Sequence, residues 1–113
     1  MIVLITDFGL SDPYAGIMKG VIKKISPSSE IIDLTHRIPP GNIVLARFIL
    51  ERSFSYFPEK TVFVAVVDPG VGTSRKPLAV RAGDYYFVGP DNGIFSFVEN
   101  LPSTPKQVVE LNR

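Results

Sequence analysis

Short apolar runs alternate with stretches of helical periodicity along the first two thirds of the chain. Ile2–Thr6 is apolar, rich in β-branched residues and followed at once by Asp7, which is the pattern of a buried strand. Residues 31–34 and 61–67 have the same character. The pattern therefore predicts three buried strands before residue 68.

An amphipathic helix is predicted between the first two of these strands. Apolar residues recur every three or four positions over residues 17–25, and Pro27 ends the pattern. Asp12 is expected to cap this helix, with Pro13 in the first helical position, where its missing N–H has no hydrogen-bond partner to lose.

A second helix is predicted after the rigid break at residues 39–41. Asn42 is suited to cap it, and the apolar residues that follow share one face: Ile43, Ala46, Leu50 and Phe54. Three apolar strands separated by two amphipathic helices are typical of a parallel sheet with right-handed crossovers.

The pattern of apolar residues changes in the second half of the chain. Residues 78–81 and 85–88 read as an antiparallel hairpin, residues 93–98 as a helical turn, and residues 107–111 as a last short strand. The predicted fold class is α/β: a Rossmann-like, largely parallel sheet flanked by helices, with an antiparallel hairpin in the second half.

Composition narrows the classes of function. The 113 residues are 45% hydrophobic and 20% charged, enough to bury the core of one domain. The net charge of +1 is spread evenly, so neither a nucleic acid nor a membrane surface is an expected partner. The absence of cysteine excludes a Cys-based zinc site, and a single histidine excludes a multi-His metal site within one chain. No run reaches the roughly 18–20 apolar residues of a membrane span. A soluble, cytoplasmic domain is expected.

Polar residues follow each of the three predicted strands. Asp7 follows the first, Thr35 and His36 follow the second, and Asp68 follows the third. Each alone is more often a turn or cap residue than a ligand contact. Because the carboxyl ends of parallel strands meet at one rim, where ligands of open α/β sheets bind, the three together favour a binding site there.

The loop over residues 68–75 is the densest candidate for that site. Its two glycines let the backbone approach a ligand, but it lacks the third glycine of a dinucleotide-binding loop. Asp68 and Arg75 flank the loop. An ion pair between them could position a water molecule or polarise a substrate, and it could equally be a surface salt bridge that braces the loop.

Two further carboxylates, Asp7 and Asp12, lie on one short loop. Paired carboxylates suit ribose hydroxyls, an ammonium group or Mg²⁺, and the sequence leaves these alternatives open. His36 has no partner nearby in the sequence that would indicate catalysis, so a structural hydrogen-bonding role is predicted for it.

Several motifs in a fixed order resemble those of the S-adenosyl-L-methionine hydroxide adenosyltransferases, hydrolase relatives of fluorinase and chlorinase. The resemblance covers nearly the whole chain from Ile2 to about Phe97. The motifs are Thr6-Asp7-Phe8-Gly9, Asp12-Pro13-Tyr14, Met18-Lys19-Gly20, Asp33-Leu34-Thr35-His36-Arg37-Ile38-Pro39-Pro40, Val64-Ala65-Val66-Val67-Asp68-Pro69-Gly70-Val71-Gly72-Thr73 and Pro90-Asp91-Asn92-Gly93.

The resemblance implies that water or hydroxide attacks C5′ of the ribose in S-adenosylmethionine and releases adenosine and L-methionine, with no metal or other cofactor. Asp68 matches the carboxylate that orients the water, and Arg75 matches its arginine partner. Asp7 matches the residue that holds the ribose hydroxyls, Asp12 an acid near the methionine amino group, and Val71 a position lining the ribose pocket.

The resemblance also implies parts that lie beyond residue 113. The family's catalytic histidine and a smaller C-terminal domain follow the matched motifs, and that domain completes the adenine pocket of a neighbouring subunit in a homotrimer. Residues 1–113 are thus expected to be a truncated N-terminal α/β domain with weak or no turnover alone. A non-catalytic nucleoside-binding or assembly module is the alternative, whereas a halogenase is disfavoured because Asp68 replaces a tyrosine.

Overall fold

A computed structural model describes residues 1–69, 76–101 and 105–111. The strands are β1 (Ile2–Thr6), β2 (Ile31–Thr35), β3 (Val62–Val66), β4 (Pro77–Ala82), β5 (Tyr85–Pro90) and β6 (Lys106–Glu110). The helices are α1 (Tyr14–Ile25) and α2 (Ile43–Ser53), with two short 3-10 helices, η1 (Phe54–Tyr56) and η2 (Ser96–Asn100).

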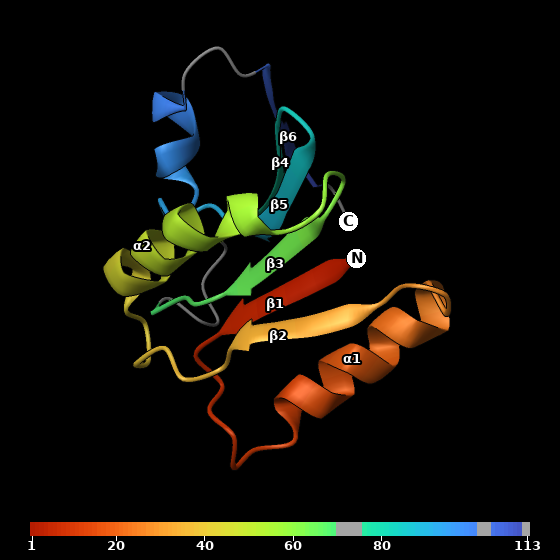
Figure 1. Cartoon of the computed structure of the whole chain (residues 1–113). Helices are drawn as coiled ribbons and strands as arrows, with labels where there is room; N and C mark the ends of the chain where they lie inside the picture. Colours follow the sequence, from red (N-terminus) through yellow and green to blue (C-terminus); the bar gives the residue numbers. More distant parts are fainter. Residues whose placement is uncertain (70–75, 102–104, 112–113) are drawn as a thin grey trace.

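The strands form one mixed sheet in the order β2-β1-β3-β5-β4-β6 (Figure 1). β2, β1, β3 and β5 run parallel, and β4 is antiparallel to both β5 and β6. This confirms the predicted α/β class, with a parallel core and antiparallel strands in the second half. The predicted antiparallel hairpin is also confirmed. Its strands are longer than expected and cover residues 77–82 and 85–90.

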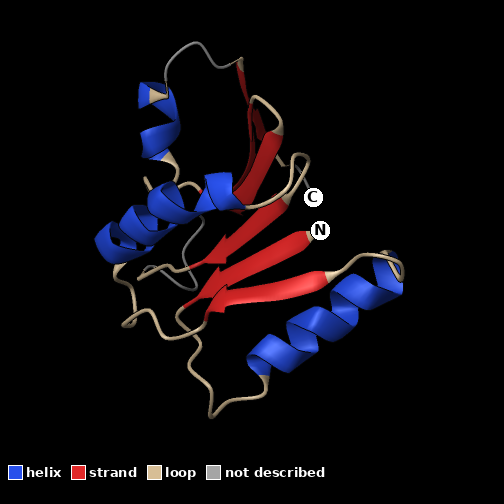
Figure 2. Ribbon diagram, in the orientation of Figure 1, coloured by secondary structure: helices blue, strands red, loops and turns tan. Residues whose placement is uncertain are grey.

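The two helical crossovers leave β1 with both faces covered. The chain passes from β1 through α1 to β2 on one side of β1, then through α2 to β3 on the other, and right-handed crossovers in opposite directions use opposite faces. Val3 and Ile5 accordingly pack in the core with Ala46 and Leu50 of α2, while Leu4, on the opposite face, is also fully buried. Figure 2 shows α1 beside β2, and α2 on the opposite side of β1, near β3.

An aromatic cluster fills the face that α2 and η2 cover. The rings of Phe63 and Phe87 stack on adjacent strands with centroids 5.3 Å apart, and Phe87 makes an edge contact with Phe97 of η2 at 5.5 Å. Phe54 joins from η1, 5.7 Å from Phe87. Such contacts stabilise a fold beyond the burial of area. The core thus anchors β3 and β5, the central strands of the sheet.

The start of α1 differs from its prediction. The helix begins at Tyr14, Pro13 occupies the N-cap position, and no side chain caps it. Asp12 was predicted as the cap and is not, because Pro13 already has helical angles just outside the helix and its carbonyl accepts the Ile17 N–H at 2.9 Å. The other cap is confirmed: Asn42 accepts the Leu45 N–H of α2 at 3.0 Å.

The predicted helical turn at residues 93–98 forms later, as η2. Gly93 has a φ of +90°, which L side chains rarely adopt, so the turn at this glycine precedes the helix. Asn92 closes that turn by accepting the Ile94 N–H. Backbone geometry at Gly93 therefore moves the helix start to Ser96.

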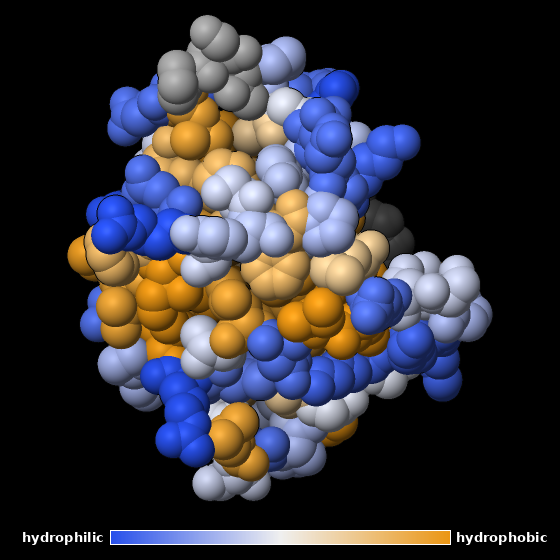
Figure 3. Space-filling view, viewed as in Figure 1, coloured by the Kyte–Doolittle hydropathy of each residue, from blue (hydrophilic) through white to orange (hydrophobic). Residues whose placement is uncertain are grey.

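Apolar side chains remain exposed on both helices. On α1 they form a stripe of Ile17, Val21 and Ile25, and on α2 they include Val44 and Phe48. Figure 3 shows hydrophobic surface gathered around α2. Within the described ranges, neither helix is long and apolar enough to cross a membrane.

Replacing Gly89 by alanine is expected to destabilise the protein. A Cβ at this position in β5 would lie 2.6 Å from the Ala65 carbonyl oxygen of β3 and 2.9 Å from the Phe95 ring. Because the carbonyl belongs to the central sheet, it cannot move without cost, and we expect the free energy of unfolding to fall by about 1–3 kcal/mol. Urea unfolding followed by circular dichroism measures the change.

Gly20→Ala is the matched control for that substitution. Gly20 lies within α1, and a Cβ there would meet no neighbour within 4 Å. Since alanine is a better helix former by about 1 kcal/mol, this variant should be as stable as the parent or slightly more so. Equal stability of the Gly89→Ala variant and the parent would contradict the close packing between β5 and β3.

Candidate functional site

The loops that follow β1, β2 and β3 are joined by hydrogen bonds at one rim of the sheet. The Asp7 N–H donates to the Val66 carbonyl at 3.2 Å, and the Gly9 N–H donates to the His36 carbonyl at 2.7 Å. The backbone N–H of Gly41 donates to the Asp7 carboxylate at 2.8 Å. These bonds bring the loop that carries Asp7 against the loop after β2 and the end of β3.

Gly41 allows the loop after β2 to touch the loop after β3. Its φ is +72°, and an added Cβ would lie 2.9 Å from the Pro69 Cβ. Only glycine fits both the backbone conformation and the space. The Asp7 carboxylate, the Gly41 amide and Pro69 thus form one contiguous surface directly before residues 70–75.

A chain of polar side chains supports this rim from below. Lys19 of α1 donates to the Asp33 carboxylate at 2.6 Å, and the other oxygen of Asp33 lies 2.7 Å from His36 Nε2. His36 Nδ1 lies 2.7 Å from the hydroxyl of Thr6, and that hydroxyl accepts the Phe8 N–H at 3.2 Å. The network therefore links α1, β2 and the loop that carries Asp7.

One tautomer of His36 satisfies every atom in the network. With the proton on Nε2, the ring donates to Asp33, while Nδ1 accepts the Thr6 hydroxyl proton. The Thr6 oxygen is then free to accept the Phe8 N–H. His36 is only 4% exposed, so its hydrogen bonds are shielded from water. The predicted structural role of His36 is confirmed.

Asp33 carries the electrostatic part of this network. Partial burial alone would raise the pKa of Asp33, but hydrogen bonds from Lys19 and His36 outweigh burial and hold this pKa below its usual value. The carboxylate therefore stays ionised at neutral pH, where it anchors both partners.

A fourth loop closes the rim from the side of β5. The Asn92 side chain donates to the Val67 carbonyl at 2.8 Å, just after β3, and the Asp91 N–H donates to the Lys76 carbonyl at 3.1 Å. The turn predicted at residues 90–93 therefore holds the backbone beside Asp68.

The other predicted site residues occupy different positions. Asp68 is half-buried and lines a cavity of about 330 Å³ together with Val66 and Pro90. Asp12 is exposed, and in the described part of the chain no hydrogen bond or ion pair joins it to Asp7. Val71 and Arg75 lie outside the described residues. Among those that are described, no three His, Cys, Asp or Glu side chains come together as a metal site would require.

Sequence reasoning missed the residues that hold the site in place. Lys19, Asp33, Gly41 and Asn92 all support the rim, yet none was predicted as part of it. A signal existed for Asp33, because a charged residue inside an otherwise apolar strand needs partners. Gly41 follows two prolines and reads as an ordinary turn residue, so the sequence alone does not reveal its contact with Asp7.

Comparison with known proteins identifies the family. A sequence model described as the SAM hydroxide adenosyltransferase N-terminal domain matches residues 2–113. The chain belongs to the SAM hydroxide adenosyltransferase family.

Relatives of known name agree with this family. The (R)-S-adenosyl-L-methionine hydrolase of Thermus thermophilus is 44% identical over 92 residues, which cover 81% of this chain and 36% of the relative. A fluorinase of Actinoplanes sp. is more distant, at 26% identity over 87% of this chain and 41% of the relative. The chain thus spans well under half the length of these curated relatives.

A solved structure has the same fold. An uncharacterized conserved protein from Thermotoga maritima superposes with a TM-score of 0.92 at 45% identity, covering 99% of this chain and 43% of that one. The mixed sheet described above is therefore shared by a crystal structure.

Thr6→Val tests the buried hydrogen bond of the network. The substitution keeps the side-chain shape but leaves His36 Nδ1 without its donor, so the free energy of unfolding should fall by about 1–3 kcal/mol. Thr35→Val is the matched control, because the Thr35 hydroxyl accepts the backbone N–H of Arg37 in an exposed position, so losing this bond should cost less. Urea unfolding of both variants measures the difference. Equal losses of unfolding free energy in the two variants would contradict a special contribution of the buried Thr6–His36 hydrogen bond.

Asp33→Asn tests the electrostatic anchor. Because folding lowers the pKa of Asp33, its contribution to stability is fully present above the ordinary value of about 4 and is lost as the pH falls through the folded value. We expect the parent to lose stability faster than Asp33→Asn as the pH falls below about 4. Urea unfolding across this pH range measures the slopes, with Glu30→Gln as a control at an exposed carboxylate. Parallel curves for the parent and Asp33→Asn would refute the assignment.

Proposed function

We propose that this chain contributes the loops that carry Asp7 and Asp68 to an enzyme that hydrolyses S-adenosylmethionine to adenosine and L-methionine. The observation that carries the proposal is the 44% identity to named (R)-S-adenosyl-L-methionine hydrolases over most of this chain. The meeting of three strand ends beside Asp7 and Asp68 supports it, because this rim is where open α/β sheets bind ligands.

The reaction is a displacement at a sulfonium centre. A bond forms between a water or hydroxide oxygen and C5′ of the ribose, the C5′–S bond breaks, and sulfur keeps the electron pair as the neutral thioether of methionine. The leaving group needs no proton, and the attacking water gives its proton to solvent. The protein must therefore aim the nucleophile and hold the ribose still.

Each predicted residue has a role in this proposal. Asp68 orients the attacking water, and Arg75 is its partner. Asp7 accepts hydrogen bonds from the ribose hydroxyls, Asp12 meets the methionine amino group, and Val71 lines the ribose pocket. The bond from Gly41 to one Asp7 oxygen supports the role of Asp7, because it fixes the carboxylate in one orientation before a ligand arrives.

Other properties of the proposed enzyme stay predictions. These are the use of S-adenosylmethionine without a metal or other cofactor, assembly of the longer protein as a homotrimer and a cytoplasmic location. Weak or absent turnover by this chain alone also stays a prediction, so ligand binding is the more sensitive measurement.

Adenosine binding to this chain tests the proposal. Titration calorimetry should detect adenosine binding to the parent, and Asp7→Asn should weaken it about tenfold or more, because hydrogen bonds to a charged acceptor contribute about 1.5–3 kcal/mol. Asp68→Asn should leave adenosine binding unchanged but abolish any release of adenosine from S-adenosylmethionine, measured by chromatography.

Glu51→Gln is the control, since it removes an exposed carboxylate from α2 instead of the rim. Failure to bind either adenosine or S-adenosylmethionine would overturn the proposal. Binding of both without any release of adenosine would favour the alternative of a nucleoside-binding module.

A further inference from the structure

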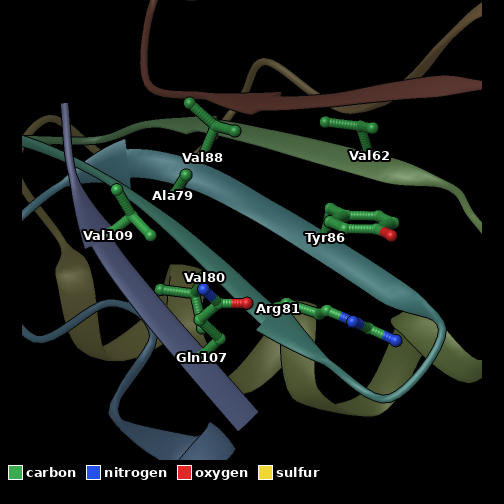
Figure 4. A pocket seen from close by; sticks show the side chains of 8 residues that line it. All are labelled: Val62, Ala79, Val80, Arg81, Tyr86, Val88, Gln107 and Val109. Carbon is green, nitrogen blue, oxygen red and sulfur yellow. The ribbon is translucent and has the colours of Figure 1, made fainter.

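The backbone pairing between β3 and β5 stops before the end of either strand. Val62 is paired with Tyr86, and the last pair is Val64 with Val88. Figure 4 shows Tyr86 and Val88 on β5, with Val62 across from Tyr86. On its other side, β5 stays paired with β4 as far as Pro90. β3 therefore continues beyond its pairing with β5 toward the candidate site.

Pro90 explains where this pairing stops. In a parallel ladder, every second residue of a strand donates its N–H to the neighbouring strand, and Tyr86 donates in this way to the Thr61 carbonyl at 3.0 Å. Residue 90 falls on the same alternation as Tyr86, and a proline has no N–H to donate. β5 therefore cannot supply a main-chain donor to β3 at this point.

A side chain supplies the next donor. The carbonyls of alternate residues in a strand point to the same side, and the Val67 carbonyl follows the alternation that faces β5. The Asn92 side-chain amide donates to the Val67 carbonyl at 2.8 Å. The preceding carbonyl, that of Val66, accepts the Asp7 N–H at 3.2 Å from the side of β1. The backbone that leads into Asp68 is therefore held from both sides.

The Asn92 amide is itself fixed in one orientation. Its oxygen accepts the N–H of Ile94, a fully buried core residue, at 3.2 Å. The Arg47 side chain of α2 donates to the Gly93 carbonyl at 3.3 Å and so holds the same turn against α2. Reversing the amide would set its oxygen against the Val67 carbonyl, and neither oxygen can donate a hydrogen bond. The amide nitrogen is therefore directed at β3.

We propose that Asn92 is a positioning residue for Asp68. Its amide replaces the main-chain donor that Pro90 lacks, and it fixes the carbonyl immediately before Asp68. This inference rests on the proposed function, in which the Asp68 carboxylate orients the attacking water. Asn92 acts through the direction in which Asp68 leaves β3, not through contact with the substrate. Because a displacement of about 1 Å at a reacting group can lower a rate about 100-fold, this restraint affects turnover.

Asn92→Asp tests the proposal with little change in shape. The new side chain still accepts the Ile94 N–H, but at neutral pH it has no donor for the Val67 carbonyl. Nitrogen-15 relaxation of this chain should show the order parameter of the Asp68 N–H falling from about 0.85 toward about 0.6. Adenosine release at saturating S-adenosylmethionine, measured by chromatography, should fall about tenfold or more. The affinity for adenosine, which depends on Asp7, should not change.

Thr61→Val is the matched control at the opposite end of β3. The buried Thr61 hydroxyl donates to the Pro58 carbonyl at 2.6 Å, so this variant also loses a side-chain bond to a backbone carbonyl. It should lose stability, measured by urea unfolding, but keep the order parameter of the Asp68 N–H and the rate of adenosine release.

An unchanged order parameter at Asp68 in Asn92→Asp would overturn the proposal, and this measurement uses no nucleoside. Adenosine release by Asn92→Asp at the rate of the parent would also overturn it. So would an equal loss of release in Thr61→Val, because turnover would then follow stability alone. Failure of the parent to bind adenosine or S-adenosylmethionine would instead contradict the proposed function, so the two failures are distinguishable.

Discussion

The buried hydrogen bond between Thr6 and His36 holds together two strand ends that differ by 30 positions in the sequence. Thr6 is the last residue of β1, and His36 directly follows β2, so the bond sets the spacing of the loops that leave both strands. The His36 carbonyl accepts the Gly9 N–H, and the Thr6 hydroxyl oxygen accepts the Phe8 N–H. The segment that carries Asp7 is thus held from both sides through the Thr6–His36 pair.

The position of the Asp7 carboxylate follows from these constraints. Its own N–H is bound to β3 through Val66, its neighbours are bound to the loop after β2, and its side chain accepts from Gly41. A carboxylate restrained in this way loses little freedom when a ligand binds. The same bonds are structural, so Asp7 stabilises the rim as well as presenting an acceptor. A variant at Asp7 therefore needs both an unfolding and a binding measurement.

Local patterns predicted most of the fold. The β-branched runs and helical spacing identify the parallel core, and Asn42 marks the start of α2 as expected. What they missed depends on atoms distant in the sequence. The helical angles of Pro13 displaced the cap expected at Asp12, and the contact between Gly41 and Pro69 joins loops 28 positions apart. Periodicity reports which face of an element is buried, but it does not report which loops touch.

Apolar side chains border the candidate site beside Asp68. The cavity beside Asp68 is walled by Val64, Val66 and Val88 and opens toward the uncovered sheet. A carboxylate near open apolar surface faces water on that side, which weakens its electrostatic interactions with a ligand. A substrate that filled the cavity would exclude that water and strengthen the charge interactions of Asp68.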